Sequence, residues 1–216
     1  MAPTVAHDPA PVLLIHGLWL RAWTLGSLAS RLRKQGFRTR RFDYASVLAS
    51  PRPALESLID LVTDCAQPPH LVGHSLGGLL ALEALRRQPL LPVARVVCLG
   101  SPLAGSRAAT SMASKPGLRR LLGPYSDLLA DGLAACPDGR QVGVIAGRLG
   151  LGLGRVFGGF DGPHDGTVAV SETRIVGLAD HCTVAASHSG LLISSDAAAR
   201  VIEFLQHGRF GSPTPA

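Results

Sequence analysis

The stretch Gly73-His74-Ser75-Leu76-Gly77 decides how this chain of 216 residues is interpreted. A short apolar run at 70–73 precedes it and predicts a buried strand, while the apolar spacing over 76–88 predicts a helix. A serine between a strand and a helix, with glycine on both sides, is typical of a tight and strained turn. Such a turn exposes the hydroxyl beside the helix N-terminus, where the helix dipole favours negative charge. We therefore predict that Ser75 is a nucleophile.

Short apolar runs alternate with helix-like segments along the whole chain, and this alternation predicts a parallel sheet covered by helices on both faces. Strands are expected at 12–15, 37–44, 70–73, 93–99, 142–146 and 182–186, and helices at 22–35, 54–66, 76–88 and 196–205. The run at 37–44 alternates apolar and basic residues, so it is expected nearer the edge of the sheet. The predicted fold class is α/β, with a reduced and mostly parallel sheet of about six strands.

The length fits one domain. We expect a flexible N-terminus at 1–11, a single domain at 12–207 and a flexible tail at 208–216. A leucine-rich insertion at about 105–138 predicts two short amphipathic helices, broken at Gly123-Pro124, that form a small cap. The glycine-rich stretch 147–162 is expected to be a surface loop, because it comes too late in the chain for a dinucleotide-binding turn.

The composition indicates a globular protein with a basic surface. Hydrophobic residues make up 46% of the chain and charged residues 17%, with a formal net charge of +6. The arginines are scattered, and only 5% of the residues are aromatic, whereas a nucleic-acid binder needs clustered basic and aromatic side chains. We therefore expect no nucleic-acid partner.

The cysteine spacing and the N-terminal segment indicate which cofactors and which cellular location to expect. The four cysteines show no spacing typical of a zinc site, and a disulfide framework is not expected, although a single bridge stays open. No metal or organic cofactor is implied. The N-terminal segment lacks the basic and apolar regions of a signal peptide, and the first apolar run is far too short to span a bilayer. A cytoplasmic location without an integral membrane segment is expected.

A serine hydroxyl needs a histidine base and a carboxylate that orients it. On a strand-to-helix turn of this kind they follow the serine in the order acid, then histidine. Asp165 follows a late strand and fits the acid, with Asp161 as the alternative. His188 follows the expected last strand and fits the base, whereas His181 precedes that strand. His164 is interpreted as a surface or supporting residue beside the acid.

Two backbone N–H groups are needed to stabilise the charge that develops on the substrate oxygen. One should belong to Leu76, and the other to Leu18 in the loop after the first strand. His16 in the same loop is interpreted as a structural histidine. Trp19 is expected to line a substrate pocket, and Trp23 either lines it or packs in the core.

Four segments carry a resemblance to a known family: Leu14–Trp19, Gly73–Gly78, Leu99–Ser106 and Asp165–Val168. With 187–190 they extend over most of the chain, from residue 12 to about 190. They resemble segments of bacterial α/β-hydrolases of the lipase and esterase type. The third is similar to the Gly-Thr-Pro-x-x-Gly-Ser stretch of lipases and of deacylases that act on lipid-linked glycans. The resemblance implies an α/β-hydrolase fold with a smaller sheet and a smaller lid than larger members have.

The residues and the resemblance together predict a serine hydrolase that cleaves carboxylic esters through Ser75, Asp165 and His188 and a covalent acyl intermediate. The leucine-rich insertion is expected to overhang the site and to favour an apolar acyl group, so the expected substrate is a small-molecule or lipid ester. Transfer of the acyl group to an alcohol or thiol, a thioesterase activity, and a non-catalytic binding scaffold are the alternatives.

Overall fold

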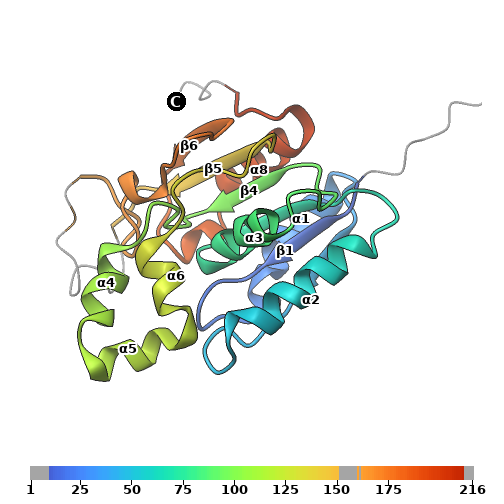
Figure 1. Ribbon diagram of the computed structural model, residues 1–216. Coiled ribbons are helices and arrows are strands. Elements are labelled where there is room, and N and C mark those ends of the chain that lie inside the picture. Colours follow the sequence, from blue (N-terminus) through green and yellow to red (C-terminus); the bar gives the residue numbers. More distant parts are fainter. Residues whose placement is uncertain (1–9, 151–159, 161, 212–216) are drawn as a thin grey trace, which may run out of the picture.

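Six parallel strands form one sheet with helices on both faces, as the sequence predicts (Figure 1). The computed structural model describes residues 10–150, 160 and 162–211. The strand order is β2-β1-β3-β4-β5-β6, and every neighbouring pair is parallel. The strands are β1 Val12–Ile15, β2 Thr39–Phe42, β3 His70–His74, β4 Val96–Leu99, β5 Val142–Gly147 and β6 Asp180–Val184.

The two sides of strand β1 face two separate cores. Leu13 and Ile15 pack in a core with apolar side chains of α2 and α3, whereas Val12 and Leu14 pack in a second core with side chains of α1 and α8. Alternate residues of a strand point to opposite faces, so a strand inside this two-faced sheet must be apolar throughout. The helices around the sheet are η1 Ala22–Leu25, α1 Gly26–Lys34, α2 Pro51–Thr63, α3 Leu76–Arg87, η3 Ser171–Thr173, η4 Gly190–Leu192 and α8 Ser195–His207.

The insertion between β4 and β5 contains three α-helices instead of the two predicted. They are α4 Arg107–Ala113, α5 Pro116–Leu122 and α6 Ser126–Asp131, with the 3-10 turn η2 Gly123–Tyr125 between the last two. Ser106 caps α4 by accepting a hydrogen bond from the Ala109 N–H group, and a proline, which is favourable in a first turn, opens α5. These local signals divide the segment before Gly123, where a leucine pattern alone predicts one helix.

The chain ends differ in part from the expected limits. The predicted flexible segments 1–11 and 208–216 and the glycine-rich loop fall largely outside the described residues. Phe210, however, lies beyond the expected domain end at 207 and is buried against Phe204, while its N–H group donates to the Asp180 carboxylate. Strand β6 begins at Asp180, two residues before the predicted start, because it extends alongside β5 from Gly143 onward.

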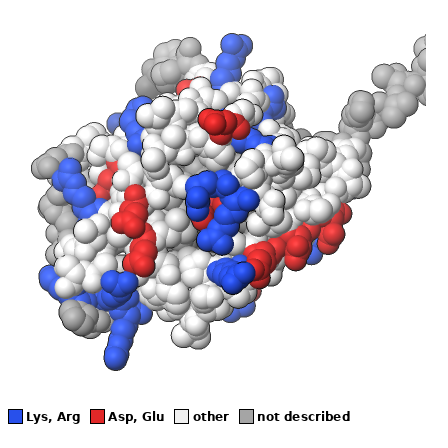
Figure 2. Space-filling view, in the orientation of Figure 1, with Lys and Arg blue, Asp and Glu red and all other residues white. Residues whose placement is uncertain are grey.

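Charged side chains are dispersed over the face of the molecule shown in Figure 2. Figure 2 shows Lys and Arg in several separate groups on one face of the molecule, with acidic side chains between them. All four cysteines are free thiols. Within the described ranges, none of the helices combines the length and the apolar character needed to cross a lipid bilayer.

The parallel registers bring the carboxyl ends of the central strands to one edge of the sheet. Ile15 pairs with Gly73, His74 with Leu99, and Leu99 with Ile145. The loops that follow β1, β3, β4 and β5 therefore leave the sheet side by side, and sites in open parallel sheets form at this edge.

Candidate active site

Ser75 lies on the turn between β3 and α3 in a backbone conformation that side chains rarely adopt. Its φ is +54° and its ψ is −120°, and its N–H group donates to the Leu99 carbonyl at 2.8 Å. A Cβ atom on Gly77 would collide with the carbonyls of Ile15 and His16, which explains why the turn needs glycine there. The turn is therefore held by β1 and β4 on its two sides, and its strain is of the kind found at functional sites.

Asp165 is a buried carboxylate whose two oxygens are both bonded. It is 1% exposed, and its Oδ1 accepts from the backbone N–H groups of Thr167 at 2.9 Å and Val168 at 2.7 Å. Its Oδ2 accepts from the Nδ1 atom of His188 at 2.7 Å. Backbone donors compensate the burial of this carboxylate, and the histidine is its side-chain partner.

His188 follows β6 and is held through both its backbone and its ring. Its N–H group donates to the Asp165 carbonyl at 2.8 Å, and the ring Nδ1 donates to the carboxylate of the same residue. Within the described part of the chain, the ring Nε2 atom makes no hydrogen bond, and the side chain is 13% exposed. The geometry therefore fixes the tautomer with the proton on Nδ1 and leaves Nε2 as a proton acceptor.

Gly100 shows how closely the acid–base pair approaches the serine turn. It directly follows Leu99, the residue that accepts the Ser75 N–H bond, and its φ is +55°. A Cβ atom at this position would lie 3.0 Å from the Asp165 Oδ2 atom and 3.2 Å from the His188 Nδ1 atom. The structure therefore brings the three predicted residues together at the exit of β3 and β4.

The alternative residues lie elsewhere or outside the description. Asp161 is outside the described residues. The Nε2 atom of His181, within β6, bonds the Thr173 hydroxyl at 2.8 Å, and burial lowers the pKa of this histidine to about 4. The Nδ1 atom of His164 accepts from the Gly166 N–H group at 3.1 Å, so this ring supports the loop that carries Asp165.

The two predicted backbone donors flank Ser75. Leu76 is the first residue of α3, and N–H groups in the first turn of a helix have no acceptor within the helix. Leu18 lies in a turn closed by a bond from the Leu20 N–H group to the Gly17 carbonyl at 3.3 Å. A Cβ atom on Gly17 would lie 3.0 Å from the Ser75 Cβ atom, so this turn packs directly on the serine.

The two tryptophans are more exposed than pocket or core residues usually are. Trp19 is 55% exposed, has a φ of +60°, and donates its indole N–H to the Leu121 carbonyl of α5 at 2.8 Å. It thus ties the loop after β1 to the insertion. Trp23 is 74% exposed, and its predicted packing in the core is therefore wrong.

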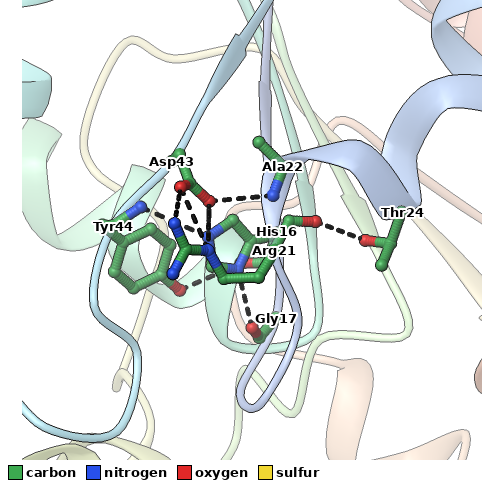
Figure 3. Close-up of polar contacts among 7 residues, drawn as sticks. All are labelled: His16, Gly17, Arg21, Ala22, Thr24, Asp43 and Tyr44. Atoms are coloured by element: carbon green, nitrogen blue, oxygen red, sulfur yellow. Dashed lines mark hydrogen bonds and ion pairs between the residues drawn. The ribbon is translucent and has the colours of Figure 1, made fainter.

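His16 connects the loop after β1 to the end of β2 (Figure 3). The ring is buried and stacks on Tyr44, with its Nδ1 atom 2.9 Å from the Gly17 carbonyl. Its Nε2 atom lies 3.2 Å from the Asp43 carboxylate and 3.3 Å from the Tyr44 N–H group, while the Tyr44 hydroxyl donates to the His16 carbonyl at 2.9 Å. This agrees with the interpretation of His16 as structural.

Asp43 and Arg21 complete this network, and the sequence does not predict either residue. Both oxygens of Asp43 bind the Arg21 guanidinium, and Oδ1 also accepts from the Ala22 N–H group at 2.9 Å. The bonds from Arg21 lower the pKa of Asp43, and burial lowers the pKa of His16. The two partners are 22 residues apart and belong to no motif, so no local signal identifies them.

In the part of the chain that the structure describes, the site is not accompanied by a cluster of metal ligands. Among the described residues, no group of three or more His, Cys, Asp or Glu side chains is placed to hold a metal ion. The arrangement instead offers a serine hydroxyl, a histidine oriented by a buried carboxylate, and two backbone N–H groups. These are the parts needed for nucleophilic acyl transfer.

A six-stranded parallel sheet with a serine on the turn after its central strand defines the α/β-hydrolase class. The sequence model of the alpha/beta hydrolase family matches residues 12–181. The chain therefore belongs to the alpha/beta hydrolase family. A comparison with curated protein sequences finds no significant match.

Solved structures of three enzymes have the same fold. A Bacillus licheniformis lipase, BlEst2 in its mature form, is 19% identical, with a TM-score of 0.74 over 94% of this chain and 93% of the lipase. A metagenomic carboxyl esterase, MGS0156, is 16% identical, with a TM-score of 0.65 over 94% of this chain and 75% of the esterase. The pyrethroid hydrolase PytH is 12% identical, with a TM-score of 0.63 over 93% of this chain and 98% of that enzyme. At these identities, the comparison establishes the fold.

Proposed function

We propose that this protein is a serine hydrolase that cleaves carboxylic esters through Ser75, Asp165 and His188. The observation that carries the proposal is the 2.7 Å bond from the His188 ring to the buried Asp165 carboxylate. Both side chains pack against Gly100, which lies beside the serine turn. A buried carboxylate with both oxygens bonded orients a histidine whose Nε2 atom makes no hydrogen bond among the described residues, and this favours a catalytic role over a non-catalytic scaffold.

The reaction follows from these positions. The His188 Nε2 atom takes the proton of the Ser75 hydroxyl as its oxygen attacks the ester carbonyl, and Asp165 stabilises the imidazolium that forms. The N–H groups of Leu18 and Leu76 bind the negative oxygen of the tetrahedral intermediate. His188 then gives the proton to the leaving alcohol, which leaves an acyl ester on Ser75. A water deprotonated by the same histidine releases the acid and restores the serine.

The insertion lies beside the loop after β1 that carries Leu18, because the Trp19 indole donates to the Leu121 carbonyl of α5. From this position and from its leucine-rich sequence we infer that the insertion favours an ester with an apolar acyl group. The three solved structures with the same fold are those of a lipase, a carboxyl esterase and a pyrethroid hydrolase, which agrees with ester chemistry. We propose a small-molecule or lipid ester as substrate. A cytoplasmic location stays a prediction.

A fluorophosphonate probe tests the nucleophile directly. We expect the wild-type protein to be labelled and Ser75→Ala to be unlabelled, with the adduct located on Ser75 by mass spectrometry. Ser101→Ala is a matched control, because this serine is also buried and directly follows Gly100. Failure of the folded wild-type protein to react, or an adduct that survives in Ser75→Ala, would contradict the proposal.

A product assay separates hydrolysis from its closest rivals. Wild-type protein is given a p-nitrophenyl ester, with and without an added alcohol or thiol, and the products are identified. Free acid as the main product in both mixtures supports a hydrolase, whereas an ester or thioester of the added nucleophile indicates an acyltransferase. A thioester substrate that is cleaved much faster than its oxygen ester indicates a thioesterase.

A further inference from the structure

We propose that His74 is a positioning residue that holds the backbone of His188 in register with the serine turn. The proposal rests on the proposed function of Ser75 and His188. His74 is the last residue of β3 and directly precedes Ser75, so its side chain is carried by the residue next to the nucleophile. It occupies the variable position of the serine-turn motif, which the motif itself leaves unassigned.

The hydrogen bond from His74 fixes its tautomer. The ring is 1% exposed, and its Nε2 atom lies 3.0 Å from the His188 carbonyl oxygen, across 114 residues of sequence. A carbonyl oxygen only accepts hydrogen bonds, so the His74 Nε2 atom carries the proton and donates. The His74 and His188 rings lie 4.8 Å apart between centroids.

The Nδ1 atom of His74 faces the loop after β1, which carries the proposed oxyanion donor Leu18. The Nδ1 atom is buried and has no hydrogen-bond partner in the described part of the chain, and a Cβ atom on Gly17 would lie 3.1 Å from it. Burial, and then the proximity of His188, lower the pKa of His74 to about 3. The ring is therefore neutral at ordinary pH and adds no charge beside the catalytic base. The ring therefore lies next to the serine turn, the loop that carries His188 and the loop after β1 that carries Leu18.

Among the described residues, His188 makes three hydrogen bonds, and the one from His74 connects it to the residue beside the nucleophile. The other two, at the backbone N–H group and at the ring Nδ1 atom, both come from Asp165. Without His74 the unit formed by Asp165 and His188 keeps its internal bonds but loses its polar attachment to the residue beside Ser75. A shift of about 1 Å between reacting groups lowers a rate by about 100-fold. The expected effect of losing this bond is therefore on kcat.

Two amide side chains offer a matched test, because they place a donor at different distances from the backbone. The amide nitrogen of glutamine can reach the place of the histidine Nε2 atom, whereas that of asparagine lies near the place of Nδ1. His74→Gln should therefore restore the bond to the His188 carbonyl. His74→Asn and His74→Leu should lose it.

The experiment measures kcat and KM for p-nitrophenyl butyrate, the rate of fluorophosphonate labelling, and urea unfolding for the wild type and the three variants. We expect His74→Asn and His74→Leu to lower kcat and the labelling rate by about 10- to 100-fold with KM within about twofold. His74→Gln should stay within about threefold of the wild type. A purely structural role predicts instead that the loss of activity follows the loss of stability in each variant, with no separate advantage for glutamine.

The outcomes also separate this inference from the proposed function. If the wild type is not labelled at Ser75, both are overturned. If it is labelled, but the variants react at the wild-type rate, change only KM, or show no advantage for glutamine, then only the role of His74 is overturned. Should His74→Leu fail to fold, the comparison of the two amide variants decides alone, because both are polar and differ in reach.

Discussion

The carboxyl edge of the sheet carries two histidine–aspartate pairs, and they differ in what else their carboxylates bind. Asp165 is 1% exposed and has His188 as its side-chain partner, at 2.7 Å. Asp43 has a side chain 38% exposed, lies 3.2 Å from His16, and is bound to Arg21 through both oxygens. The first pair stands beside β4 and β6, and the second follows β1 and β2 (Figure 3).

The difference shows why a histidine next to an aspartate is not by itself a base. In His16 both ring nitrogens face backbone groups within hydrogen-bond distance, and the charge of its aspartate is matched by an arginine. In His188 one nitrogen is bound and the other is free, and the carboxylate has no competing cation among its side-chain contacts in the described residues. The first pair fixes a loop, and the second can accept and return a proton.

Removal of each histidine should give the largest contrast. We expect His188→Ala to lower kcat for a p-nitrophenyl ester by about 10⁴- to 10⁶-fold, because the base is lost. His16→Ala should lower the free energy of unfolding by about 2–4 kcal/mol, through lost packing and hydrogen bonds. Its kcat should fall by at most about 10³-fold, the cost of one misplaced oxyanion donor. Steady-state kinetics and urea unfolding check both; a larger kcat loss in folded His16→Ala than in His188→Ala would reverse the assignment.

Neutralising each aspartate gives the next contrast. Asp165→Asn should lower kcat by about 10⁴-fold, since the amide cannot stabilise the imidazolium and favours the wrong tautomer. Asp43→Asn should leave kcat within about tenfold and lower stability by about 1–2 kcal/mol, because it weakens the bonds to Arg21 and the Ala22 N–H group. The same assays apply. Equal kcat losses in the two variants would mean that the two pairs are not distinct in function.

Acidification should destabilise the folded protein through its buried histidines. Burial lowers the pKa of His16 in the folded protein, that of His74 to about 3, and those of His70 and His181 to about 4, against an ordinary value of 6.5. The unfolded chain therefore binds more protons than the folded protein below pH 6.5, and stability should fall from that pH down to about 4. Each group contributes up to about 1.4 kcal/mol per pH unit of its shift.

Urea unfolding midpoints at pH 7.5, 6 and 5 measure this slope. His16→Gln should show a shallower slope than the wild type, because an amide does not titrate. A wild-type midpoint that stays constant or rises as the pH falls would show that these histidines are not buried in the neutral form.

The fold and the serine turn were predictable because their signals are local. Five apolar runs and the alternating run at 37–44 predicted the six strands, and Ser75 stands between a strand and a helix within nine residues of sequence, 70–78. The need for an acid and a histidine followed from the chemistry of a serine nucleophile, and their order along the chain followed from the type of turn that carries Ser75. Asp165 and His188 do lie together, although their roles stay a prediction.

The remaining parts of the site depend on contacts between distant residues. Arg21 meets Asp43 only because β1 and β2 are neighbours in the sheet, and Trp19 meets Leu121 only because α5 lies over the loop after β1. The role of His74 depends on its contact with His188, which lies 114 positions later in the sequence. Neither periodicity nor motif spacing contains this information, since each describes residues close along the chain.

The bond between His74 and His188 joins two parts of the site that the ribosome synthesises at different times. The serine turn needs only β1, β3, β4 and α3, whose residues are synthesised first, whereas its partner loop is completed at residue 188. Domains generally fold as units. A nascent chain therefore contains Ser75 long before it contains His188, and the proposed acid–base pair can form only after residue 188 has emerged from the ribosome.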